Sequence, residues 1–90
     1  MTARRTVEIV NERGLHARAS AKFVKLASEY DAEVRVSREG STVDARSIMG
    51  LMMLAAGIGS EVELEADGPQ AEEAVQALAE LVAARFHEER

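Results

Sequence analysis

Residues 33–45, Glu-Val-Arg-Val-Ser-Arg-Glu-Gly-Ser-Thr-Val-Asp-Ala, decide the fold class. Apolar and polar residues alternate in 33–37, which is typical of a strand with one buried and one solvated face. Glu39 and Gly40 follow with the residue types of a tight turn, and a second short segment, 41–45, comes directly after them. The stretch therefore predicts a β-hairpin.

Two further segments, 6–10 and 61–66, have the same two-residue period, so we expect a sheet of four strands. In the second segment Glu61, Glu63 and Glu65 alternate with apolar residues. Three carboxylates on one face of a strand indicate that this face of the sheet is solvated, which explains them more simply than a metal site.

Three segments predict helices. They are 17–30, the short apolar stretch from Ser47 to Ala56 with Ser47 as N-cap, and a segment opened by Pro69. The expected apolar face of the first helix consists of Ala17, Ala21, Val24 and Ala27, flanked by Phe23 and Leu26. The order strand, helix, hairpin, helix, strand, helix predicts one α+β domain over residues 1–90, with helices on one face of a four-stranded sheet.

Composition excludes several classes of function. The 90 residues include 11 basic and 16 acidic side chains, a net charge of −5, and no cysteine, which rules out disulfides, thiolate zinc sites and thiol nucleophiles. Two phenylalanines and one tyrosine are the only aromatic residues, so nucleic acid is not an expected partner. No apolar run is long enough to span a membrane or form a signal peptide, and we expect a cytoplasmic protein.

The loop between the first strand and the first helix holds the candidate site. His16 falls where the helix begins, and the unpaired amides of a helix N-terminus attract anions. Gly14 allows the sharp entry, and Arg18 in the first turn could bind phosphoryl oxygens. We therefore expect His16 to be a solvent-exposed nucleophile beside an anion site. The alternative is that His16 is a surface residue that only caps the helix.

Two motifs carry a resemblance to a known family. Gly-Leu-His-Ala-Arg at 14–18 and Ser-Ile-Met-Gly-Leu-Met at 47–52 resemble the two hallmark motifs of the HPr family, the histidine-containing phosphocarriers of the phosphoenolpyruvate-dependent phosphotransferase system. The resemblance implies a βαββαβα open-faced sandwich with an antiparallel sheet. It also implies that His16 accepts a phosphoryl group on Nδ1 from Enzyme I, stabilised by Arg18, and passes it to an EIIA-type acceptor. No cofactor is expected.

The sequence departs from the family motif after Arg18. Ala19 and Ser20 stand where proline and alanine are usual. This variant resembles the nitrogen-related regulatory branch of the family, in which the phosphoryl group ends on regulators. The role could therefore lie in sugar uptake or in regulatory phosphotransfer, and nothing in the sequence identifies the final acceptor.

The segment after Ser47 contains more apolar side chains than a short helix can bury, which indicates a docking surface for partner proteins. Ser47 is either an N-cap alone or, as the HPr resemblance implies, a regulatory site for an HPr kinase/phosphorylase. The expected docking residues are Leu15, Ala17, Ser20, Ile48, Met49, Leu51 and Met52.

Three other functions compete with the carrier. A hydrolase would pair Ser20 with His16, but the segment lacks an orienting acid. An acyl carrier would be modified on Ser47, but its helical fold conflicts with the strand pattern. A purely structural module would use the methionine-rich surface and would never carry phosphate on His16. A carrier that presents one small face to successive partners is expected to be a monomer.

Overall fold

The computed structural model describes residues 1–90 and contains a single four-stranded sheet. The strands are β1 (Thr2–Glu8), β2 (Glu33–Arg38), β3 (Ser41–Asp44) and β4 (Glu61–Asp67). All neighbouring strands are antiparallel, and their order across the sheet is β1-β4-β2-β3. The last strand thus lies in the middle of the sheet, between the first strand and the hairpin.

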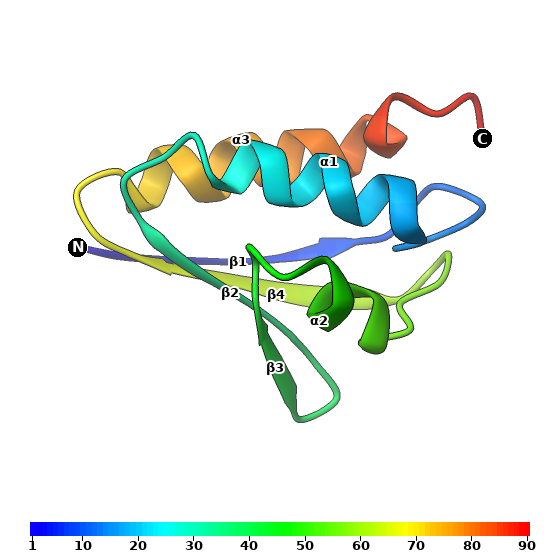
Figure 1. The fold of residues 1–90 in the computed structure, drawn as a ribbon, viewed down its shortest axis with the longest axis horizontal. Helices are drawn as coiled ribbons and strands as arrows, with labels where there is room; N and C mark the ends of the chain where they lie inside the picture. Colours follow the sequence, from blue (N-terminus) through cyan, green and yellow to red (C-terminus); the bar gives the residue numbers. More distant parts are fainter.

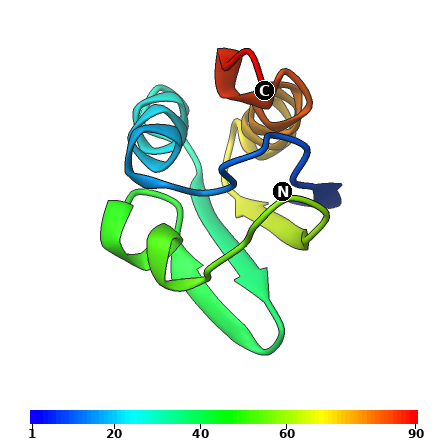
Figure 2. The same ribbon diagram turned by 90° about the vertical axis from the view of Figure 1, so that its right-hand side faces the viewer.

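The helices lie on one side of this sheet (Figures 1 and 2). They are α1 (Ala17–Ala27), α2 (Ile48–Met53) and α3 (Ala71–Ala83), and a short 3-10 turn, η1 (Arg85–His87), follows α3. Helix α3 packs on β1 and β4, whereas α2 packs on α1 and β3. None of these helices has the length and apolar character needed to cross a lipid bilayer. The predicted α+β class, element order and layering are confirmed.

Some predicted boundaries were wrong. Strand β1 begins at Thr2 and not at Thr6, because the whole segment pairs with β4. Helix α2 ends at Met53, and Ala55 has a left-handed φ of 52° that a helix cannot continue through. The 3-10 turn at 85–87 was not predicted.

The hairpin forms as the sequence indicates. Arg38 pairs with Ser41, which leaves Glu39 and Gly40 as a two-residue loop. Both have positive φ, 49° and 86°, as a type I′ turn requires.

Helix α1 buries only part of the predicted face: Ala27 is buried, and Val24 and Leu26 pack partly buried against the core. Ala17 and Ala21 are exposed, whereas Phe23 is buried together with Ala19 and Ala27, one turn before and after it. The reason is that Phe23 contributes the largest apolar surface of the helix and occupies the core. The 23 buried apolar residues form one continuous cluster between sheet and helices.

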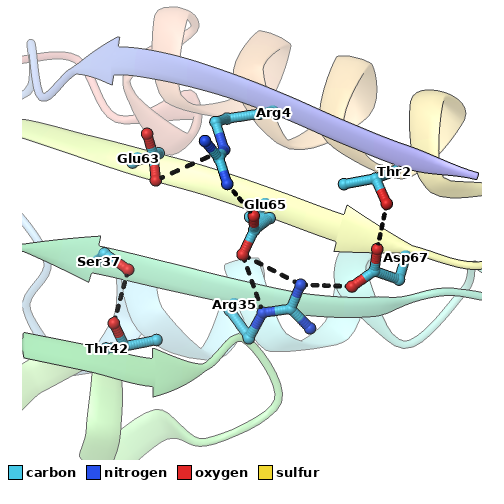
Figure 3. Close-up of polar contacts among 8 residues, drawn as sticks. All are labelled: Thr2, Arg4, Arg35, Ser37, Thr42, Glu63, Glu65 and Asp67. Carbon is cyan, nitrogen blue, oxygen red and sulfur yellow. Dashed lines mark hydrogen bonds and ion pairs between the residues drawn. The ribbon is translucent and has the colours of Figure 1, made fainter.

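The opposite face of the sheet carries a polar network (Figure 3). Glu65 on β4 accepts hydrogen bonds from Arg4 on β1 and from Arg35 on β2 at 3.1 Å. Arg35 also donates to Asp67 at 2.5 Å, and Thr2 donates to the other oxygen of that carboxylate. The network joins three neighbouring strands and neutralises part of the acidity of β4.

These contacts lower the pKa of both carboxyl groups. Hydrogen bonds from Arg4 and Arg35 hold the pKa of Glu65 below its ordinary value, and those from Thr2 and Arg35 do the same for Asp67. Both groups therefore contribute stability above the ordinary carboxyl pKa of about 4, and this contribution is lost as the pH falls through their lower folded-state values.

The free energy of unfolding should fall as the pH is lowered from about 6 to about 2. We predict that it falls less steeply in Glu65→Gln, because this variant lacks the carboxyl group whose protonation destabilises the folded chain. The measurement is urea denaturation from about pH 6 to about pH 2. The matched control is Glu72→Gln, which removes an exposed carboxylate of α3 that has no ion pair. An equally steep decline in Glu65→Gln and the wild type would contradict the role of the network.

Candidate functional site

The loop that enters α1 is held against the segment that follows α2. The amide of Leu15 donates to the carbonyl of Ala56 at 3.0 Å, and the side chain of Leu15 is buried. On the other side of the loop, the amide of Gly59 donates to the carbonyl of Ile9 at 2.8 Å. The two loops therefore form one unit at this end of the sheet.

Gly14 is required by this close approach. Its φ is +64°, and a Cβ atom added to it would lie 2.3 Å from the carbonyl oxygen of Ala56 and 2.8 Å from the Cα atom of Gly57. Both obstacles are backbone atoms and cannot rotate away. Only glycine lets the chain turn here and deliver His16 to the start of α1.

His16 is the N-cap residue of α1, as predicted. Its backbone is extended, with φ −72° and ψ 177°, and its carbonyl accepts from the amide of Ser20 at 2.9 Å. The imidazole makes no capping hydrogen bond, so His16 caps the helix through its backbone alone. The amides of Ala17, Arg18 and Ala19 donate to no group within the chain. Those of the exposed residues Ala17 and Arg18 are available to an anion placed beside His16, whereas Ala19 is fully buried.

Ala19 does not interrupt the first turn of α1. Where the family motif has proline, which carries no N–H, this chain has an alanine with an unpaired amide. Its side chain is fully buried and its helical geometry is undisturbed. The substitution therefore keeps the shape of the first turn, and because the whole residue is buried, its amide does not face the solvent.

The imidazole is less exposed than the sequence indicates, with 17% of the side chain accessible. The cause is Glu88, which follows η1 and whose Oε2 contacts Nε2 of His16. The other carboxylate oxygen, Oε1, accepts from Nδ2 of the buried Asn11 at 3.1 Å. Burial raises the pKa of Glu88, but the hydrogen bonds from His16 and Asn11 outweigh burial and keep this pKa below its ordinary value.

Sequence reasoning missed Glu88 and Asn11. Glu88 lies 72 positions from His16, beyond the predicted last helix, in a run of charged residues that looks like a solvated end. Asn11 looks like an ordinary turn residue. No local pattern connects either residue to the loop histidine.

Charged side chains line the hollow in front of His16. Besides His16, this surface hollow of about 260 Å³ is lined by three arginines and three glutamates: Arg13, Arg18, Arg90, Glu12, Glu88 and Glu89. None of the three guanidinium groups is engaged in a salt bridge. Arg18 is thus placed as predicted, beside the imidazole, and Arg13 and Arg90 add positive charge that the sequence analysis did not assign.

Ser47 is the N-cap of α2, as predicted, and its Oγ accepts from the amide of Gly50 at 2.9 Å. The helix it caps exposes Met49 by 70% and both Ile48 and Met52 by 40%. Met52 also lines a second hollow that borders His16. The structure therefore brings the methionine-rich surface and the histidine together.

Three of the predicted docking residues were wrong. Leu15, Ser20 and Leu51 are buried and cannot touch a partner, because they fill the space between the loop, α1 and α2. The Oγ of Ser20 donates to the carbonyl of Leu15 at 3.2 Å, which also removes the hydrolase pairing of Ser20 with His16. The exposed members of the predicted set are Ala17, Ile48, Met49 and Met52.

Comparison with known proteins defines the class. Residues 3–84 match the family model described as the PTS HPr component phosphorylation site, which makes the chain a carrier protein of the phosphotransferase system and not an enzyme. A phosphocarrier protein HPr of Cupriavidus necator is 58% identical over 84 residues, covering 93% of this chain and 94% of that protein. The chain belongs to the HPr family.

Relatives of two kinds match. A phosphocarrier protein NPr of Klebsiella oxytoca is 43% identical over 90 residues, covering 99% of this chain and all of that protein. The crystal structure of HPr-C-His from Thermoanaerobacter tengcongensis superposes with a TM-score of 0.93 at 42% identity, covering 98% of this chain and 99% of that one. The fold predicted from the family resemblance is therefore confirmed.

We predict that Gly14→Ala lowers the free energy of unfolding by at least about 2 kcal/mol, because it adds a backbone clash to the left-handed conformation. Gly40→Ala is the matched control, since Gly40 has φ +86° but nothing within 4 Å of an added Cβ. That variant should lose about 1 kcal/mol. Equal losses in urea denaturation would show that the approach to Ala56 is not a constraint.

Proposed function

We propose that His16 accepts a phosphoryl group from phosphorylated Enzyme I and passes it to an EIIA-type acceptor, in the cytoplasm where phosphoenolpyruvate is made. The observation that carries this proposal is the imidazole at the N-cap of α1 beside the unpaired amides of the exposed residues Ala17 and Arg18. The amides and the helix dipole stabilise a phosphoryl group in front of the helix. Arg18 adds a guanidinium that can bind two phosphoryl oxygens.

The same geometry favours transfer over storage. A phosphoimidazole has a good leaving group, so the P–N bond is readily broken by the next nucleophile. The site is a hollow on the surface of the molecule, which lets two different partner proteins reach it in turn. The preorganised amides stabilise the charge of the phosphoryl group through hydrogen bonds, which do not have to be replaced by covalent bonds when the group is passed on.

We assign partner docking to the exposed surface beside His16. Ala17, Ile48, Met49 and Met52 are exposed on α1 and α2, and Met53 is 79% exposed next to them. Flexible methionine side chains adapt to differently shaped partners. A carrier that meets a donor and an acceptor on one face needs this adaptability.

Ser47 is proposed as a regulatory phosphorylation site for an HPr kinase/phosphorylase. Its hydroxyl lies at the start of α2, in the docking surface, and its side chain is only partly buried. A phosphate there would be tolerated by the helix N-terminus but would repel acidic groups of a docking partner.

The function is tested with Enzyme I and labelled phosphoenolpyruvate. We expect wild-type chain to take up acid-labile, base-stable label, and His16→Ala to take up none, because the accepting nitrogen is absent. His87→Ala is the control, since His87 is the only other histidine and lies in η1. This control should be labelled at the wild-type rate.

Arg18→Ala is a further variant in that experiment, for which we expect slower labelling and not a complete loss. It should be labelled more slowly with an unchanged denaturation midpoint, because the guanidinium is exposed and makes no ion pair within the chain. Label that persists in His16→Ala would remove His16 from the mechanism.

For Ser47, we predict that Ser47→Asp weakens binding to Enzyme I while Ser47→Asn does not. Both side chains are good N-caps, so helix α2 is preserved in each and only the negative charge differs. Binding is measured by titration calorimetry with purified Enzyme I. Equal affinities of the two variants would reject an electrostatic switch at this position.

A further inference from the structure

The C-terminal segment returns to the loop that holds His16. In Figures 1 and 2 the red end of the chain lies near the blue loop that precedes α1. Its closest approach is at Glu88, whose Oε2 contacts Nε2 of the imidazole. Only 16% of the Glu88 side chain is exposed, so the contact is largely shielded from water.

Several contacts hold Glu88 in this place. The ring of Phe86 is fully buried, and its carbonyl accepts from Nζ of Lys22 at 2.7 Å. The amide of Glu12 donates to the carbonyl of Arg90 at 3.0 Å, which ties down the other side of the segment. Glu88 is thus fixed from both directions along the chain.

The backbone before Glu88 is strained. Arg85, Phe86 and His87 have φ values of 58°, 53° and 64°, in the left-handed region that side-chain-bearing residues rarely adopt. Three such residues in a row reverse the chain after α3. Strain of this kind persists only where the surrounding structure enforces it, and it is frequent at functional sites.

We propose that Glu88 is a positioning residue that sets the tautomer of His16 and makes Nδ1 the accepting nitrogen. The inference rests on the proposed function of His16. A carboxylate can only accept, so the proton of the neutral imidazole must lie on Nε2, and Nδ1 keeps its lone pair. Asn11 locks the carboxylate, because its Nδ2 donates both to Oε1 of Glu88 and, at 2.9 Å, to the carbonyl of Gly14.

Glu88 has a second role during the transfer, because the imidazole ring becomes positively charged when it is phosphorylated. The Nδ1 lone pair forms the new N–P bond while the bond between phosphorus and the donor breaks, and its electron pair leaves with the donor. The ring then carries a positive charge and keeps its Nε2 proton. The Glu88 carboxylate faces that proton and stabilises the charge, and in onward transfer the ring leaves as neutral imidazole.

The test distinguishes a Glu88 that positions the imidazole for phosphoryl transfer from a Glu88 that only stabilises the fold. Three variants are compared with the wild type: Glu88→Ala, Glu88→Gln, and the control Glu89→Gln, which removes the neighbouring carboxylate that has no side-chain contact with His16. Imidazole ¹⁵N chemical shifts of the unphosphorylated chain report the tautomer. Labelling by Enzyme I and phosphoenolpyruvate reports the rate, and urea denaturation reports folding.

We expect the Nε2–H tautomer to dominate in the wild type and in Glu89→Gln. Glu88→Ala should give a mixture of tautomers and slow labelling by about tenfold or more, since a ring in the wrong tautomer cannot attack through Nδ1. Glu88→Gln keeps an accepting oxygen without the charge, so it should restore the tautomer and recover part of the rate.

An unchanged tautomer in Glu88→Ala, or a changed tautomer with wild-type labelling, would overturn the proposal. A slower rate that tracks only a loss of stability would also overturn it and leave Glu88 as a structural tie. Failure of the proposed function itself has a different signature: either the wild type takes up no label, or label persists in His16→Ala whatever stands at position 88.

Discussion

The contact between the loop before α1 and the backbone at Ala56 is the constraint on which the site depends. Gly14 approaches the Ala56 carbonyl too closely for any side chain, and the amide of Leu15 donates to the same oxygen. This contact fixes the direction in which the chain enters α1. The position of His16 at the N-cap, and the exposure of its neighbouring amides to an incoming anion, follow from that entry.

The site is built from parts that are weak individually. Unpaired helix amides and free arginines are common on protein surfaces, but here they meet in one surface hollow beside an imidazole that Glu88 holds in place. Elsewhere the chain pairs its polar groups, as in the network of Arg4, Arg35 and Glu65 on the open face of the sheet. The groups left unpaired around His16 are therefore the ones available for binding a phosphoryl group.

Much of the fold could be predicted because the sequence is locally consistent. The two-residue periods and the Glu39–Gly40 turn predict the hairpin, and Ser47 predicts the start of α2. What could not be predicted depends on distant contacts. The buried face of α1 is decided by where Phe23 finds space in the core, and the cover over His16 is decided by a chain reversal after α3 that places Glu88 beside it. Neither has a periodic or motif signal.

The role of His16 is tested most directly by locating the phosphoryl group on the phosphorylated chain. The chain, ¹⁵N-labelled in its histidines, is phosphorylated with Enzyme I and phosphoenolpyruvate, and the one-bond coupling between ³¹P and ¹⁵N is measured by NMR. We expect coupling to Nδ1 of His16 alone. Coupling to Nε2 of that ring, or to a nitrogen of His87, would contradict it.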